Sequence, residues 1–217
     1  MYGTVFTQAS QNALAVLGKS GLMSGAYLAG GSGLALNFGH RYSEDFDFFS
    51  DKEFSKRDVR IWTNHTAKAT KSEDLEYQTL HGQEVYYFHY PQEVVKIDFA
   101  YFPFEHVGQY LMDEKLRVCS VLDIGINKLH AFTTRKRGRD YVALYDIIHT
   151  GGLTLEELFK GYRLKFDVYV QPEEWAKHFM GILDATDQPR FLGKRTWDTI
   201  EMYFTNTAKS IVLTSRS

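Results

Sequence analysis

The chain has 217 residues, enough for one large domain or two small ones, and hydrophobic residues make up 44% of it. Cys119 is the only cysteine, which excludes an internal disulfide and a cysteine-based zinc site. The formal net charge is -2, so any nucleic-acid contact must come from a local basic patch. We expect a cytoplasmic protein with no membrane contact, because no apolar stretch could span a bilayer and the N-terminus lacks a signal-peptide pattern.

Hydrophobic periodicity and the positions of glycines predict a mixed sheet with helices in the first half of the chain. The predicted elements are, in order, a helix at 8–19, a strand at 27–29, a short helix at 34–38, a strand at 45–49, a helix at 56–70 and strands at 75–80, 84–90 and 94–101. Gly39 suits the C-terminal end of the short helix.

After about residue 114 the pattern becomes helical. The predicted helices cover 121–132, 140–149, 155–166, 172–183 and 196–207. A sheet followed by helices is typical of an α+β protein. We therefore expect an α/β core over residues 1–115 and a helical C-terminal subdomain over residues 116–217.

Asp45 and Asp47 alternate with phenylalanines. Alternate residues of a strand share a face, so both carboxylates would lie opposite Phe46 and Phe48. Neighbouring carboxylates repel unless they are solvated, protonated or bridged by a cation, and oxygen ligands favour a hard cation such as Mg²⁺. Asp98 has the same alternation on a later strand. Three such groups can hold two Mg²⁺ ions for in-line phosphoryl chemistry.

A glycine-rich turn precedes these acids. Gly30 and Gly31 let the backbone come close to an anion, and the following helix directs its N–H groups and positive dipole end toward that anion. Ser32 adds a hydroxyl. A triphosphate could therefore lie between this turn and Mg²⁺ held by Asp45 and Asp47.

The segment LAGGSGLALNFGHRYSEDFDFF, residues 28–49, resembles the AbiEii/AbiGii-type nucleotidyltransferase toxin family of the polymerase-β-like superfamily. That family's signature runs Gly-Gly-Thr/Ser, a short apolar helix, His-Arg-x-Ser and Asp-x-Asp. Two later segments also match it: VVKIDFA at the third-acid strand, and KLHAFTTRKRGRDYVALYDI from Lys128 to Ile147. The resemblance covers about residues 10–150, with a serine at position 32 where threonine is common.

The resemblance implies an enzyme that moves a nucleoside monophosphate from an NTP to an acceptor, in some members the 3′ end of tRNA. On this resemblance Asp45 and Asp47 would bind Mg²⁺, and Asp98 would be the third carboxylate of the site. Gly31 and Ser32 would contact the phosphates. Lys128 and Asp140 match functional positions in the later block of the family. Asp98 would act as general base or as a ligand of the second metal. Arg41 and Ser43 belong to the matched signature as expected nucleotide contacts, although Arg41 could instead pair with Glu44 or a sheet carboxylate.

Lys128, Arg135 and Arg139 have the spacing i, i+7 and i+11, which on one helix predicts a basic stripe. We expect this stripe to contact phosphate or RNA and the helical subdomain to complete the active-site cleft. Asp140 would hold one of the cations or assist the chemistry. Alternatively, Gly138 breaks the helix and leaves Arg135 to Arg139 in a solvated loop.

The leading hypothesis is an Mg²⁺-dependent nucleotidyltransferase that acts on RNA or tRNA as the toxin of a toxin–antitoxin or phage-defence system. The partners expected for it are an NTP, the RNA and a cognate antitoxin. One alternative is an antibiotic-type enzyme with a small-molecule acceptor. Another is a non-catalytic module that binds nucleotide or RNA. The basic cluster RKRGR favours an RNA acceptor.

Overall fold

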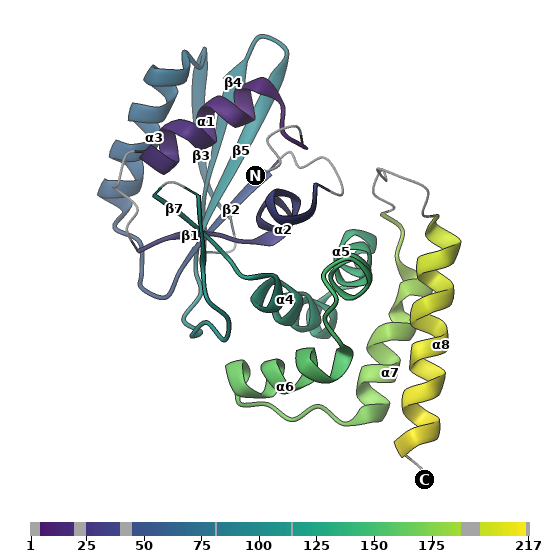
Figure 1. Ribbon diagram of the computed structural model, residues 1–217. Helices are drawn as coiled ribbons and strands as arrows, with labels where there is room; N and C mark the ends of the chain where they lie inside the picture. Colours follow the sequence, from purple (N-terminus) through teal and green to yellow (C-terminus); the bar gives the residue numbers. More distant parts are fainter. Residues whose placement is uncertain are drawn as a thin grey trace. The chain divides into compact units, whose positions relative to one another are not determined.

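The computed structural model describes residues 5–19, 25–39, 45–80, 82–113, 115–187 and 196–215. The chain forms two compact units: Met1–Glu105 with Gln109–Ser120, and His106–Gly108 with Val121–Ser217. A mixed sheet comes first and helices follow, which confirms the predicted α+β class (Figure 1). The first unit continues past the expected boundary at residue 115, because the strand Leu116–Val118 belongs to its sheet.

The first unit is built on a mixed sheet, with seven strands among the described residues in the order β3-β4-β5-β2-β1-β7-β6. The strands are β1 (Tyr27–Leu28), β2 (Asp45–Ser50), β3 (Asp74–Leu80), β4 (Gln83–Tyr90), β5 (Glu93–Tyr101), β6 (Leu111–Asp113) and β7 (Leu116–Val118). β2 is parallel to β5 and β1 is parallel to β7, whereas the other pairs are antiparallel. The sequence did not predict β6 and β7, because three residues are too few to show alternation.

The phenylalanines of β2 decide which of its faces is buried. Phe46 and Phe48 are both buried, as the alternation predicted. The Phe48 ring lies edge-on to Trp62 at 5.4 Å between centroids and stacks on Phe99 of β5 at 5.7 Å. Trp62 belongs to α3 (Lys56–Thr70), which packs beside α1 (Gln8–Lys19). Asp45 and Asp47 therefore point away from this core.

The glycine-rich segment does not form a separate turn before a helix. α2 (Gly30–Phe38) begins at the first glycine, so the predicted start at residue 34 is wrong. The glycines form its first turn. Gly39 ends the helix in the left-handed conformation (φ 61°) and donates its N–H to the carbonyl of Ala35 at 2.8 Å, as the sequence predicted.

The second unit is helical in its described part. Its helices are α4 (Val121–Thr134), α5 (Gly138–His149), α6 (Leu155–Phe166), α7 (Pro172–Met180) followed by a 3₁₀ turn (Gly181–Asp184), and α8 (Trp197–Ser215). Phe132, Tyr141, Phe179 and Phe204 pack together in its core. α8 extends beyond the predicted end at residue 207, because no glycine or proline follows to stop it. No helix in the described ranges is long and apolar enough to cross a bilayer.

The predicted basic stripe on a single helix is wrong. α4 ends at Thr134 and α5 begins at Gly138, so Lys128 and Arg135 do not share a helix. The Gly138 N–H donates to Asp187 Oδ1 at 2.7 Å, and a β-carbon at Gly138 would lie 2.0 Å from the Asp187 carbonyl oxygen. This close backbone approach fixes where α5 begins.

Asp123 of α4 holds the segment His106–Gly108 within the second unit. Its fully buried carboxylate accepts the N–H groups of Val107 at 3.1 Å and Gly108 at 2.8 Å. Lys165 of α6 donates to it from a buried ammonium at 2.8 Å. A buried carboxylate is tolerated only when it is paired and hydrogen-bonded. This cluster explains why an upstream segment belongs to the helical unit.

Replacing Lys165 with methionine should lower the free energy of unfolding by about 3–5 kcal/mol, because it removes the buried ammonium that pairs with the Asp123 charge. Urea denaturation followed by circular dichroism measures this loss. Lys160→Met is the matched control on the exposed side of the same helix and should cost less than about 0.5 kcal/mol. Equal losses in the two variants would contradict a structural role for the buried pair.

Candidate functional site

The parallel pairing of β2 with β5 brings acidic and basic side chains to one face of the sheet. In the register of this pair Asp47 lies beside Asp98, and Asp45 lies beside Lys96. Because side chains alternate along both strands, these four residues share the face opposite Phe46 and Phe48. The register of β2 and β5 therefore brings Asp98 beside Asp47, as the sequence predicted.

The first turn of α2 lies directly against Asp47. Gly30 has a φ of +59°, and a β-carbon on it would lie 2.0 Å from Asp47 Oδ2. The Ala29 N–H donates to the Asp47 carbonyl at 2.8 Å, which ties β1 to β2 just before the helix begins. The N-terminal N–H groups of a helix have no intrahelical acceptor and favour negative charge. The glycine at position 30 therefore allows a helix start and a carboxylate to approach closely.

Ser32 contacts the protein itself in this structure, and its expected contact with phosphate stays a prediction. Its side chain is fully buried, and its hydroxyl donates to the backbone carbonyl of Asp45. This bond joins α2 to the start of β2, so the geometry assigns Ser32 to positioning Asp45 and does not turn its hydroxyl toward solvent. Gly31 lies in the same turn and is partly exposed.

Lys96 is a site residue that the sequence analysis did not single out. Its Nζ donates to Asp98 Oδ2 at 2.5 Å. Burial raises the pKa of Asp98, and the Asp47 and Asp45 charges raise it further against the opposing effect of Lys96. Burial lowers the pKa of Lys96, but its bond to Asp98 and the charges of the three carboxylates outweigh this and raise it. The alternation of β5 could have identified Lys96, because it lies two residues before Asp98 and so shares the same face of the strand.

The carboxylate oxygens of Asp45, Asp47 and Asp98 are ligands of the type that a hard cation prefers. Asp98 Oδ1 is buried and has no hydrogen-bond partner among the residues that the structure describes. Such an oxygen is costly unless a donor or a cation engages it. Within the same described residues, no three acidic, histidine or cysteine side chains already converge on one point. Lys96 holds Asp98 Oδ2, which leaves Asp98 Oδ1 as the oxygen that could join Asp45 and Asp47 in holding Mg²⁺.

Arg41 and Ser43 lie outside the described residues. Their expected contacts with nucleotide stay predictions.

The later block of predicted residues forms an ion-pair network within the second unit. Asp140 is fully buried and accepts from Lys128 Nζ at 2.6 Å and from Arg135 Nε at 2.8 Å. Arg139 instead lies 3.9 Å from Asp187. Asp140 is thus the common counterion of Lys128 and Arg135, which agrees with the expectation that it holds a cation in place.

Burial by itself would raise the pKa of Asp140, but the charges of Lys128 and Arg135 lower it to about 2. The carboxylate therefore stays ionised throughout the physiological range. A carboxylate that is already bonded to two cations is a poor proton acceptor, so its described contacts favour the positioning role over the chemical one.

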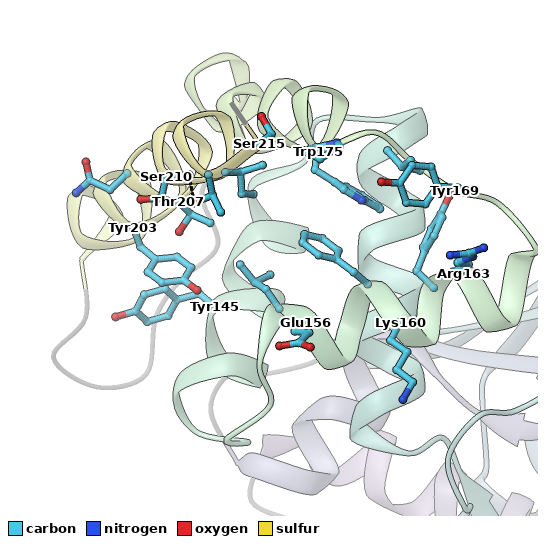
Figure 2. A pocket seen from close by; sticks show the side chains of 18 of the residues that line it. Tyr145, Glu156, Lys160, Arg163, Tyr169, Trp175, Tyr203, Thr207, Ser210 and Ser215 are labelled. Carbon is cyan, nitrogen blue, oxygen red and sulfur yellow. Dashed lines mark hydrogen bonds between the residues drawn. The ribbon is translucent and has the colours of Figure 1, made fainter. Parts of the chain in front are cut away.

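A pocket of 1110 Å³ lies within the second unit (Figure 2). Its lining is mostly aromatic and aliphatic and comes mainly from α6, α7 and α8. Trp175 stacks on Phe159 at 5.0 Å between centroids, and Tyr145 lies edge-on to Tyr203 at 5.4 Å. Among the described residues that line it, none was predicted to be catalytic or to bind phosphate. An apolar lining of this kind does not suit a triphosphate.

Because the folded-state pKa of Asp140 is depressed, its contribution to stability is present above its unfolded pKa near 3.8 and is lost as the pH falls toward 2. We expect this contribution to be about 2 kcal/mol. Asp140→Asn should therefore lower the free energy of unfolding at pH 7 and flatten its decline between about pH 4 and pH 2, as measured by urea titrations. Asp184→Asn, which weakens the exposed pair with Lys136, is the control and should leave the acid profile unchanged.

Comparison with known proteins places these observations in a family. The model of the family described as "Nucleotidyl transferase AbiEii toxin, Type IV TA system" matches residues 12–198. An uncharacterized protein of Aquifex aeolicus, aq_aa25, is 26% identical over 151 residues, which cover 67% of this chain and 68% of that protein.

Two crystal structures from Helicobacter pylori support the fold. JHP933 has a TM-score of 0.58 at 15% identity, covering 94% of this chain and 91% of that one. A second structure, described as a candidate nucleotidyltransferase, has a TM-score of 0.59 at 15% identity, with 94% of each chain covered. Since the family model spans most of the sequence, the protein belongs to the AbiEii nucleotidyltransferase toxin family and is a nucleotidyltransferase.

Proposed function

We propose that the protein uses Mg²⁺ to transfer a nucleoside monophosphate from an NTP to an RNA acceptor. The observation that carries this proposal is the register of β2 and β5, which sets Asp47 beside Asp98 on the face that also carries Asp45. Carboxylate oxygens are the ligands that Mg²⁺ prefers. When bound, the metal would neutralise triphosphate charge and polarise the phosphoryl group.

The chemistry assigned to the acids is an in-line displacement. A hydroxyl oxygen of the acceptor forms a bond to the α-phosphorus, while the bond from that phosphorus to the bridging oxygen breaks and pyrophosphate leaves. Asp98 accepts the proton of the hydroxyl or helps to hold the metal. Its Oδ1, buried without a hydrogen-bond partner among the described residues, supports either role.

We propose that the N-terminus of α2, together with Lys128 and Arg135 of the second unit, holds the phosphates. Gly30 and Gly31 bring backbone N–H groups of the helix N-terminus close to Asp47, where an anion bridged by a cation would be stabilised. Lys128 and Arg135 share the single charge of Asp140 and so retain net positive charge. We propose that Lys128 contacts phosphate and that the helical unit completes the active site.

We also propose that the protein acts as the toxin of a toxin–antitoxin pair, with a cognate antitoxin as its partner. The family description supports this role. This proposal includes a part in phage defence and a cytoplasmic location.

Incubation with each α-labelled NTP and total RNA, followed by separation of RNA from protein and small molecules, tests the proposed acceptor. Asp47→Asn should reduce RNA labelling by at least about 100-fold, which corresponds to about 3 kcal/mol of lost transition-state stabilisation. Asp51→Asn, which neutralises an exposed carboxylate close by, should keep normal labelling. Labelling of small molecules alone would favour the antibiotic-type alternative, and normal activity of Asp47→Asn would refute the metal assignment.

The close approach of Gly30 to Asp47 gives a separate prediction. Gly30→Ala and Gly82→Ala both place a β-carbon on a residue with positive φ, so each should cost about 1–2 kcal/mol in unfolding free energy. Only the Gly30 substitution also pushes against a carboxylate, because nothing lies within 4 Å of a β-carbon at Gly82. Nucleotide transfer should therefore fall at least about tenfold in Gly30→Ala and remain normal in Gly82→Ala. Similar losses of transfer in both variants would show that backbone strain alone matters.

A further inference from the structure

The outer face of α3 carries a cluster of exposed basic and polar side chains that the proposed chemistry does not use. They line a hollow of 680 Å³ and are Lys56, Arg57, Arg60, Asn64, His65 and Lys68. The opposite side of α3 is buried through Val59 and Trp62. The two faces of this helix therefore have separate roles, with the apolar one fixed against the sheet.

The spacing of the cluster aligns its members along the helix. Lys56, Arg60, Asn64 and Lys68 are each four residues apart, so they form one row with steps of about 6 Å. Like charges four residues apart, such as Lys56 and Arg60, repel and weaken a helix. The row does not arise from the needs of helix stability, which points to a ligand outside the chain.

Few acidic groups neutralise the cluster. Lys56 lies 3.1 Å from Glu84, and Asp58 is the only acidic residue of α3. Within the described part of the chain, Arg57, Arg60 and Lys68 have no acidic partner at ion-pairing distance. The protein has a net charge of -2, so this face is locally positive on an overall slightly acidic chain.

We propose that the outer face of α3 binds the phosphate backbone of the RNA acceptor. This inference rests on the proposed function, because it assigns the acceptor to a surface of the first unit. Lys56 and Arg60 lie about 6 Å apart along the helix axis and Lys68 lies about 12 Å beyond Arg60, so each of these cations can meet a different phosphate of an extended strand. An anionic membrane fits less well: of the residues that line the hollow, Ile61 alone is a large apolar one, at 49% exposed, and a membrane-surface helix would present an apolar face.

The position of α3 defines what this surface does. α3 packs on the side of β2 that carries Phe48, whereas Asp45 and Asp47 belong to the other side. The α3 face thus holds the body of the RNA and not its reacting hydroxyl. Its loss should weaken RNA binding and raise the KM for RNA while leaving kcat unchanged.

The test compares two variants with the same change in charge. Arg60→Glu/Lys68→Glu alters the α3 row, and Lys160→Glu/Lys177→Glu alters exposed lysines of the second unit. Binding of fluorescein-labelled oligouridine is measured by anisotropy between about 50 and 200 mM KCl. The α3 variant should bind at least about tenfold more weakly, and its salt dependence should fall by about 0.7 for each phosphate contact removed. The control variant should bind as the unmodified protein does, and urea denaturation verifies that both are folded.

The outcomes separate this inference from the proposed reaction. If the unmodified protein labels no RNA but the α3 variant still loses oligouridine binding, the surface is supported and the RNA-acceptor reaction is refuted. If RNA is labelled but the α3 variant binds it with unchanged affinity and salt dependence, the surface is refuted and the reaction stands. A lowered kcat with unchanged affinity would also refute the surface. Binding to phosphatidylserine vesicles without binding to oligouridine would overturn the assignment in favour of a membrane.

Discussion

The parallel pairing of β2 with β5 is the constraint on which the candidate site depends. Phe48 is buried against Trp62 of α3 and Phe99 of β5, and Phe46 is buried against Phe6. This burial decides which face of β2 receives the aspartates. The register then sets Asp47 beside Asp98 and Asp45 beside Lys96. A shift of one residue would send the acids into the core and the phenylalanines into solvent. Apolar packing on one face therefore enforces a concentration of charge on the other.

That concentration of charge is balanced by groups that the protein itself supplies. Lys96 engages one oxygen of Asp98, and the start of α2 lies against Asp47 because Gly30 has no side chain. Ser32 fixes the same helix to the backbone at Asp45. The helix start, the two strands and the lysine thus form one connected arrangement, in which a change at any member alters the surroundings of the acids.

Asp123 and Asp140 are fully buried in the described part of the helical unit and are neutralised in different ways. Asp123 accepts hydrogen bonds from two backbone N–H groups and pairs with Lys165, whose side chain is itself buried. These contacts are typical of a structural role. Asp140 is shared by Lys128, which is 12% exposed, and Arg135, which is 45% exposed. Only the second arrangement keeps cations within reach of an anionic ligand. The difference in exposure thus supports a functional role for Lys128 and Arg135 and a structural one for Lys165.

The sequence by itself determined the features that depend on local pattern. The alternation at Asp45 and Asp47, the αL end at Gly39 and the order of a sheet followed by helices could all be predicted, as could the family, because each is recorded in nearby residues. The short strands β6 and β7 were missed because they have no periodicity of their own and exist through pairing.

Tertiary structure decided the features that join distant segments. Lys96 became a site residue through the pairing of two strands, Ser32 turned to the β2 backbone, and the bond between Gly138 and Asp187 separated α4 from α5. Each of these contacts depends on which segments meet and how closely their backbones approach. Local periodicity shows which side chains of one strand share a face but not which segments meet, so only the folded chain could show which charged groups of different segments lie together.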